Sequence, residues 1–170
     1  PISEDETNMT FLGIIAFLDP PKPDAKEAIR GLYDAGVHVK VISGDAPVVV
    51  EHVCKLVGMK VGNQSAVTGS DLENMSDAEL SSVVEKNDIF ARLSPMQKKR
   101  VVDALRNNGH VVGYMGDGVN DAPSLHDADV GISVDNGTDV AKASADIILL
   151  EKSLTVILNG IYEGRRIYGN

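Results

Sequence analysis

The sequence has 170 residues, of which 43% are hydrophobic and 24% are charged, so we expect one soluble globular domain with a hydrophobic core. The formal net charge of −9 argues against a nucleic-acid partner, because nucleic-acid binding requires clustered basic residues. No run approaches the roughly 18 apolar residues of a membrane span, and the N-terminus lacks a signal-peptide pattern, so the segment itself is predicted to be soluble and cytoplasmic.

In chain order, a polar stretch at residues 1–10 is followed by apolar runs, which predict strands, and by amphipathic patterns, which predict helices. The predicted strands are residues 11–18, 37–42, 66–68, 88–91, 110–115, 130–134 and 146–150. The predicted helices are residues 24–35, 47–57, 77–85, 94–108 and a last one that begins at Ser153, with short helices between the strands after residue 115.

Capping residues mark several of these helix boundaries. Asp24 and Glu27 resemble a capping box, and Ser94 with Gln97 has the same pattern around a proline at the first helical position. Glycines that typically end helices stand at positions 36, 58 and 109. The only cysteine, Cys54, excludes an internal disulfide and lies on an apolar helix face, so we expect a buried thiol.

Continuous apolar strands separated by helices are typical of strands that are buried on both faces. We therefore predict an α/β fold, with a doubly wound, Rossmann-like, mostly parallel sheet and helices on both of its faces. In sheets of this kind, ligands bind at the carboxyl ends of the strands. The residues at these strand exits are therefore the candidates for function.

Polar residues follow the first two predicted strands. Asp19, with two prolines behind it, follows the first strand, and Ser43, Gly44 and Asp45 follow the second. A hydroxyl and a glycine before a helix offer O–H and N–H donors to a phosphate oxygen. The same pair also serves as an ordinary helix cap and turn, so this motif alone leaves both interpretations open.

Charged residues follow two later strands. Lys98 lies in the first turn of its predicted helix, where the helix dipole disfavours a cation, so we expect an anionic group nearby. Considered alone, Lys98 fits better as an ordinary surface lysine beside a carboxylate. The stretch Gly116–Asp121 places Asp117 and Asp121 among glycines, which suits a Mg²⁺ site that keeps waters and borrows phosphate oxygens. Asn120 and Asp121 would hold the metal waters or the phosphate loop. Together these strand exits predict a phosphoryl-transfer site.

With these motifs the sequence resembles the haloacid-dehalogenase superfamily, and within it the phosphorylation domain of P-type cation-transporting ATPases. The motifs are DPPK at 19–22, SGD at 43–45, SPMQK at 94–98 and GDGVNDAPSL at 116–125. The last is nearly identical to the family's usual form across ten residues. The resemblance covers residues 11–170, and residues 131–154 with EGRR at 163–166 are most similar to the bacterial magnesium-transporting branch.

The resemblance implies roles in phosphate and nucleotide binding. Ser43, beside Gly44, would hold a phosphoryl oxygen of the substrate ATP. Lys98 would neutralise the charge of that phosphoryl group and of the aspartyl nucleophile. Asp19 and Asp45 would lie near the nucleotide and the hinge to the ATP-binding domain.

The resemblance also implies a metal site. Asp117 would ligate the catalytic Mg²⁺, and Asp121 would support or share that role. Asn120 would bond to the phosphoryl group. The implied activity is ATP hydrolysis coupled to cation transport, through an aspartyl-phosphate intermediate.

The family's phosphorylated aspartate lies in an Asp-Lys-Thr-Gly-Thr motif, which this sequence does not contain. We therefore interpret residues 1–10 as the connection from a nucleotide-binding domain, and residues 11–170 as the C-terminal portion of a phosphorylation domain that ends at the stalk of a transmembrane helix. The implied partners are the nucleotide-binding and actuator domains and the transmembrane helices of the same chain, at the cytoplasmic face of the cell membrane. Without the strand that carries the nucleophile, the sheet would have an unfilled position, and the segment alone is expected to be inactive.

Two other interpretations are possible. A stand-alone Mg²⁺-dependent phosphatase of the same superfamily would use Asp19 as its nucleophile. The superfamily normally has an Asp or Thr two residues after the nucleophile, and here that position is Pro21, which has no proton to donate. A non-catalytic response-regulator-like or binding module would explain the topology, but it would not explain Lys98 together with GDGVND.

Overall fold

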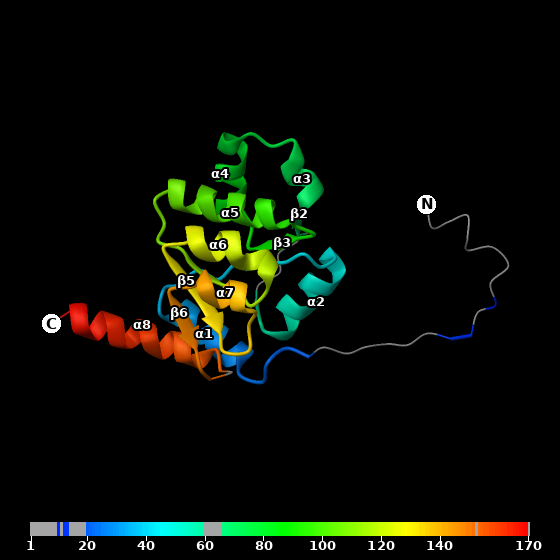
Figure 1. Cartoon of the computed structure of the whole chain (residues 1–170). Coiled ribbons are helices and arrows are strands. Elements are labelled where there is room, and N and C mark those ends of the chain that lie inside the picture. The colour runs from blue at the N-terminus through cyan, green and yellow to red at the C-terminus, as the bar shows by residue number, and fades with distance from the viewer. Residues whose placement is uncertain (1–9, 11, 14–19, 60–65, 152, 170) are drawn as a thin grey trace.

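Short parallel strands form the centre of the described part of the chain, which comprises residues 10, 12–13, 20–59, 66–151 and 153–169 of this computed structural model (Figure 1). Most of the predicted strand at 11–18 lies outside these residues, and so does Asp19. Within the described ranges, no helix combines the length and the apolar composition needed to cross a bilayer.

The strands form two three-stranded parallel sheets. In the first sheet the order is β1 (Val41–Ile42), β3 (Ile89–Ala91), β2 (Val67–Thr68), and in the second it is β4 (Gly113–Met115), β5 (Val130–Val134), β6 (Ile147–Leu149). All of these pairs are parallel, as the alternation of strands and helices predicts. The two sheets share no ladder within the described residues, so the predicted sheet is present as two parts.

A helix follows each of the six strands in the described part of the chain. They are α1 (Ala25–Asp34), α2 (Pro47–Leu56), α3 (Gly69–Glu73), α4 (Asp77–Lys86), α5 (Pro95–Asn107), α6 (Ala122–Asp127), α7 (Asp139–Ala143) and α8 (Thr155–Tyr168), with a 3-10 turn at Val119–Asp121. Gly36, Gly58 and Gly109 follow α1, α2 and α5 as predicted, and their φ angles of 73°, 80° and 89° are the left-handed conformation that glycine tolerates best. Helix α3 was not predicted.

The two predicted capping boxes have different outcomes. The Ser94 box is confirmed, because the Ser94 hydroxyl accepts from the Gln97 amide at 3.3 Å and Gln97 Oε1 accepts from the Ser94 amide at 2.9 Å. The Asp24 box is wrong, because the Asp24 side chain makes no capping bond to α1. Its carboxylate instead accepts hydrogen bonds from residues at the start of α8, including the Leu154 amide at 2.6 Å.

The hydrophobic core surrounds the sheets in three clusters. One cluster packs α2 against the first sheet and includes Cys54, which is buried as predicted. This burial raises the pKa of the Cys54 thiol to about 11. The second cluster packs α4 and α5 against Phe90 of β3. The third lies between α5, α6 and β4, around Tyr114 and Leu125. Strand β3 is buried along its whole length, which agrees with the predicted two-sided burial.

Strands β4 and β6 depart from that prediction. Met115 on β4 is 36% exposed, and Ile147 on β6 is 47% exposed. The register places both beside Ile132 of β5, so the three side chains share one face of the second sheet. Helices α6 and α7 pack on the second sheet from its other side, as Figure 1 shows, while α8 extends away from the body of the molecule and packs on α1.

Candidate functional site

The GDGVND loop, defined as Gly116–Asp121, leaves the second sheet at the carboxyl end of β4. The Gly116 amide donates to the Ile132 carbonyl at 3.0 Å, which extends the β4–β5 pairing by one residue. The Asp121 amide then donates to the Gly118 carbonyl at 3.1 Å, and the Gly118 amide donates back to Asp121 Oδ2 at 3.2 Å. The loop is therefore a closed turn that holds the Asp121 carboxylate against its own backbone.

Glycine is required at position 116 for a steric reason. A Cβ atom at Gly116 would lie 2.5 Å from the Asp121 Cβ and 2.8 Å from its Cγ. Real Cβ atoms do not approach other atoms so closely, because the repulsion between them is too strong. The glycine of the motif therefore makes room for the carboxylate, and its φ angle is not in the left-handed range.

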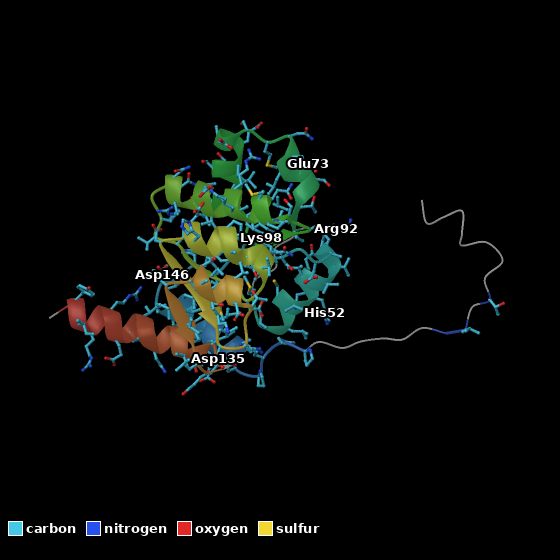
Figure 2. The ribbon with its side chains drawn as sticks, in the orientation of Figure 1. His52, Glu73, Arg92, Lys98, Asp135 and Asp146 are labelled. Atoms are coloured by element: carbon cyan, nitrogen blue, oxygen red, sulfur yellow. The ribbon has the colours of Figure 1, made fainter. Side chains whose placement is uncertain are left out.

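Lys98 reaches the GDGVND loop from the first turn of α5. Its Nζ atom lies 2.8 Å from Asp121 Oδ1, and the two side chains are only 12% and 13% exposed. The ion pair joins residues that are 23 positions apart. Asp121 thus supplies the anionic group that the position of Lys98 in its helix predicts. In Figure 2, Lys98 lies near the centre of the molecule.

A second donor reaches the same carboxylate oxygen. The Tyr114 hydroxyl, from β4, donates to Asp121 Oδ1 at 3.0 Å. Burial alone would raise the pKa of Asp121, but the hydrogen bond and charge of Lys98, with the Tyr114 hydroxyl and the Gly118 amide, hold that pKa below its ordinary value. Burial and the negative charge of Asp121 raise the pKa of Tyr114, so its hydroxyl stays protonated as a donor.

Sequence reasoning missed Tyr114. The residue lies three positions before Asp117, in the middle of a run that was interpreted only as a buried strand. A signal was available, because a tyrosine in a buried strand needs a partner for its hydroxyl. The periodicity of the strand could not identify Asp121 as that partner.

Asp117 and Asn120 are the exposed polar residues of the loop. The Asp117 carbonyl accepts a hydrogen bond from the Thr138 amide at 2.8 Å, which ties the loop to the start of α7. Neither side chain makes a hydrogen bond or ion pair to the described residues. Both are therefore free to meet a ligand that approaches the end of the second sheet.

Ser43 and Asp45 form a second loop at the end of β1. The Ser43 hydroxyl donates to Asp45 Oδ2 at 3.0 Å and accepts from the Asp45 amide at 3.1 Å. Gly44, between them, is exposed. Among the described residues, no hydrogen bond joins Ser43 to Lys98 or to the GDGVND loop. The structure therefore brings Lys98 and Asp121 together, while Ser43 is bonded to Asp45.

Arg92 connects the Ser43 loop to the start of α5. Its amide donates to the Asp45 carbonyl at 2.9 Å, and the Leu93 amide donates to the Ser43 carbonyl at 3.0 Å. Among the described residues, Arg92 is the one non-glycine residue with a positive φ angle, at 53°. Such backbone conformations cost free energy and cluster at functional sites. Figure 2 shows the exposed Arg92 toward the margin of the molecule.

The chemistry of this site suits magnesium more than a metal that needs several protein ligands. The described residues hold no group of three or more His, Cys, Asp or Glu side chains placed to bind a metal ion. Mg²⁺ requires only one or two carboxylates, because it keeps several waters and takes phosphate oxygens as further ligands. The exposed Asp117 carboxylate fits that requirement. Asp121 already accepts three hydrogen bonds and fits a supporting role.

Comparisons with known sequences find one family and a set of long relatives. The family described as haloacid dehalogenase-like hydrolase matches residues 2–129. Magnesium-transporting ATPase, P-type 1, is 56% identical over 167 residues in Salmonella typhimurium strain LT2 and 50% identical over 166 residues in Escherichia coli strain K12. Each of these matches covers 98% of this chain and 18% of the relative, so the chain spans less than a fifth of their length.

Two further comparisons extend the set. Calcium-transporting ATPase 1 of Bacillus cereus is 40% identical over 166 residues, which cover 97% of this chain and 19% of that protein. Among solved structures, the chain is similar to the catalytic domain of the CPx-ATPase CopB-B, from a study of its conformational changes upon nucleotide binding. The TM-score is 0.63 at 29% sequence identity, over 83% of this chain and 45% of that chain.

Proposed function

Because the chain belongs to the haloacid dehalogenase-like hydrolase family, we propose that it is part of the phosphorylation domain of an ATP-driven P-type cation pump, and that the pump transports magnesium. The observation that carries the proposal is the 56% identity to a magnesium-transporting ATPase over 98% of the chain. Identity to the Bacillus cereus calcium-transporting relative is lower, at 40%. The Lys98–Asp121 ion pair and the exposed Asp117 carboxylate of the same loop support the same proposal through their chemistry.

We assign residues 11–170 to the C-terminal portion of that domain and residues 1–10 to the connection from a nucleotide-binding domain. Each match covers only 18% of the relative, which supports further domains in the same chain. The remaining domains of the pump, its actuator and its membrane helices would then be the partners of this segment. The segment would lie at the cytoplasmic face of the membrane.

In this proposal the chain's own residues bind and orient the transferring phosphoryl group of ATP. Lys98 stabilises negative charge on the phosphoryl oxygens, and Asp121 holds the Lys98 ammonium in place. The Ser43 hydroxyl and the Gly44 amide bind a phosphoryl oxygen, which requires the Ser43 hydroxyl to exchange Asp45 for substrate. Asn120 donates to the phosphoryl group from the exposed part of the loop. Asp45, together with Asp19 outside the described residues, faces the nucleotide.

Asp117 is the proposed ligand of Mg²⁺, with Asp121 in support. When bound there, Mg²⁺ supplies positive charge that stabilises the phosphoryl oxygens during transfer. Asp117 suits this role because its carboxylate is exposed at the end of β4 and its backbone is held by Thr138. Asp121 orients the loop through the Gly118 amide.

The nucleophilic aspartate is proposed to lie outside these 170 residues. The division of the parallel strands into two sheets supports this, because Ile42 of β1 and Val112 before β4 each pack against both the second and the third core clusters. Among the residues that the structure describes, β1 and β4 each have one unpaired edge, and both edges border the same side chains. A further parallel strand between them would unite the sheets and carry its residue to the edge where Asp117 lies.

Formation of a phosphoenzyme from ATP tests this function. In the ATPase that contains this segment, we expect Asp117→Ala to reduce the rate of phosphoenzyme formation by at least about 100-fold, the size typical of losing an electrostatic stabiliser of the transition state. Asp34→Ala is the matched control, since Asp34 is exposed on α1 and its one ion pair among the described residues is with Arg30 at 4.0 Å. Wild-type phosphorylation with normal Mg²⁺ dependence in the Asp117→Ala protein would exclude the assigned site.

A further inference from the structure

Tyr114, Asp121 and Lys98 form a continuous hydrogen-bonded chain that joins the core to the candidate site. Asp121 Oδ1 accepts both the Tyr114 hydroxyl at 3.0 Å and the Lys98 ammonium at 2.8 Å. The second oxygen, Oδ2, accepts the Gly118 amide at 3.2 Å. The carboxylate is thus held by a strand, by a helix and by its own loop.

The Tyr114 ring is fixed by the core. The residue is 7% exposed and packs in the third cluster with Val102, Leu125 and Ala141. Its register partner on β5 is Gly131, and a side chain at that position would collide with the Leu125 carbonyl. A phenylalanine would fill the same volume, so packing alone does not account for the hydroxyl. What the hydroxyl adds is its hydrogen bond to Asp121.

Lys98 depends on Asp121 for its position. Within the described residues, the Lys98 ammonium has a single hydrogen-bond acceptor, Asp121 Oδ1. Long lysine side chains have many rotamers, and an ion pair selects one of them at an entropic cost. Any tilt of the carboxylate therefore moves the ammonium with it. Tyr114 opposes such a tilt, because its ring is fixed in the core and its hydroxyl holds Asp121 Oδ1.

We propose that Tyr114 is a positioning residue, whose hydroxyl fixes the Asp121 carboxylate and, through it, the Lys98 ammonium that faces the transferring phosphoryl group. The link to phosphoryl transfer rests on the proposed function above. The link from Tyr114 to Lys98 rests on the geometry alone. The two parts therefore have separate measurements.

The first measurement is kinetic. In the ATPase that contains this segment, we expect Tyr114→Phe to lower the maximal rate of phosphoenzyme formation about ten-fold, as is typical for residues that orient a functional group. The ATP concentration for half-maximal rate should stay unchanged, because the Tyr114 side chain is buried in the core and its hydroxyl is bonded to Asp121. Ser133→Ala is the matched control, because it also removes a buried hydroxyl from the second sheet, but one without a hydrogen-bond partner in the described residues.

A double-mutant cycle shows whether Tyr114 acts through Asp121. In an Asp121→Asn background, Tyr114→Phe should have almost no further effect on the rate, because the carboxylate that it orients is gone. Equal losses in both backgrounds would mean that Tyr114 has only a general structural role, and would overturn the proposal. Wild-type rates in Tyr114→Phe alone would overturn it as well.

The second measurement does not require phosphorylation. In the 170-residue chain without nucleotide, the ¹⁵N signal of the Lys98 ammonium should be sharp and slow to exchange with water in the wild type and in Ser133→Ala. It should broaden or vanish in Tyr114→Phe. An unchanged signal would refute the link from Tyr114 to Lys98. Should the wild-type ATPase form no phosphoenzyme, the proposed function would fail, and this signal alone would decide the positioning role.

Discussion

At the scale of single residues, the site depends on how little space surrounds Asp121. The carboxylate lies between the Lys98 ammonium, the Tyr114 hydroxyl and the Gly118 amide. Because Gly116 has no side chain, there is room beside it for the Cβ of Asp121. Each of these contacts restrains a different motion of the side chain. Asp121 is therefore the residue around which the loop is organised, while Asp117 remains exposed for a ligand.

Gly116→Ala tests this steric argument. The added Cβ would lie 2.5 Å from the Asp121 Cβ, so the loop or the carboxylate must move. We expect the free energy of unfolding, measured with urea, to fall by about 1–3 kcal/mol. Gly160→Ala on α8 is the control, because a Cβ there meets no atom within 4 Å and a helix gains stability from alanine. Equal stability of wild type and Gly116→Ala would contradict the close approach.

At the scale of elements, α8 is attached almost entirely through α1. None of its residues is buried. At its start, Asp24 Oδ2 accepts the Ser153 hydroxyl at 2.7 Å and the Leu154 amide at 2.6 Å. Farther along, Leu158 occupies the space above Gly31, and Arg165 donates to the Ala35 carbonyl at the other end of α1. The two helices are therefore joined at both ends, which makes α1 and α8 a single unit.

Acid should weaken this attachment. The hydrogen bond from the Ser153 hydroxyl, the largest effect, lowers the pKa of Asp24 below 3.8, with smaller help from the Leu154 and Thr155 amides. A lowered pKa means that the ionised carboxylate stabilises the folded chain fully above pH 3.8, and that this contribution is lost as the pH falls through the folded-state pKa. We expect hydrogen-exchange protection at the start of α8 to decline in that range.

Asp24→Asn provides the matched comparison. At neutral pH it should lower the protection factors of α8 about five-fold, which corresponds to the roughly 1 kcal/mol of a lost helix cap. It should also abolish their decline in acid. Asp34→Asn, an exposed change on the same helix α1, should leave both unchanged. Protection in α8 that is independent of Asp24 would show that helix packing alone holds the element.

At the scale of the whole molecule, the two sheets and their exposed strands indicate contacts beyond the described residues. Met115 and Ile147 expose apolar surface on one face of the second sheet, and no ladder between described residues joins the two sheets. Strands of parallel sheets are normally covered on both faces. A domain completed by further segments of a pump would explain both features.

This view predicts that the chain alone does not turn over a phosphate ester. We expect no hydrolysis of a generic phosphomonoester with or without Mg²⁺, either by the wild-type chain or by Asp19→Asn, in protein whose circular dichroism shows it to be folded. The reason is that the proposed nucleophile lies outside these residues. Mg²⁺-dependent hydrolysis that disappears in Asp19→Asn would instead establish a self-sufficient phosphatase.

The sequence alone determined several helix boundaries and the strand directions, because the interactions that set them involve residues only a few positions apart. Ser94 caps α5 together with Gln97, three positions away, and Gly109 ends the same helix through its own φ angle of 89°. Alternating apolar runs and helical patterns likewise predicted parallel strands, because parallel neighbours need a long crossover connection, which a helix usually supplies. The order of the elements in the chain therefore follows from nearest-neighbour chemistry.

Tertiary structure alone decided which distant groups meet. Asp24 has the sequence pattern of a cap for α1, but α8, 130 residues away, offers its amide to the same carboxylate. Tyr114 belonged to a predicted strand, and only the packing of β4 beneath α5 and α6 brought its hydroxyl to the oxygen that Lys98 also binds. Caps, turns and periodicity are local energies that a sequence displays directly. The partner of a buried polar group depends on how the elements pack, and that is decided only when the whole chain has folded.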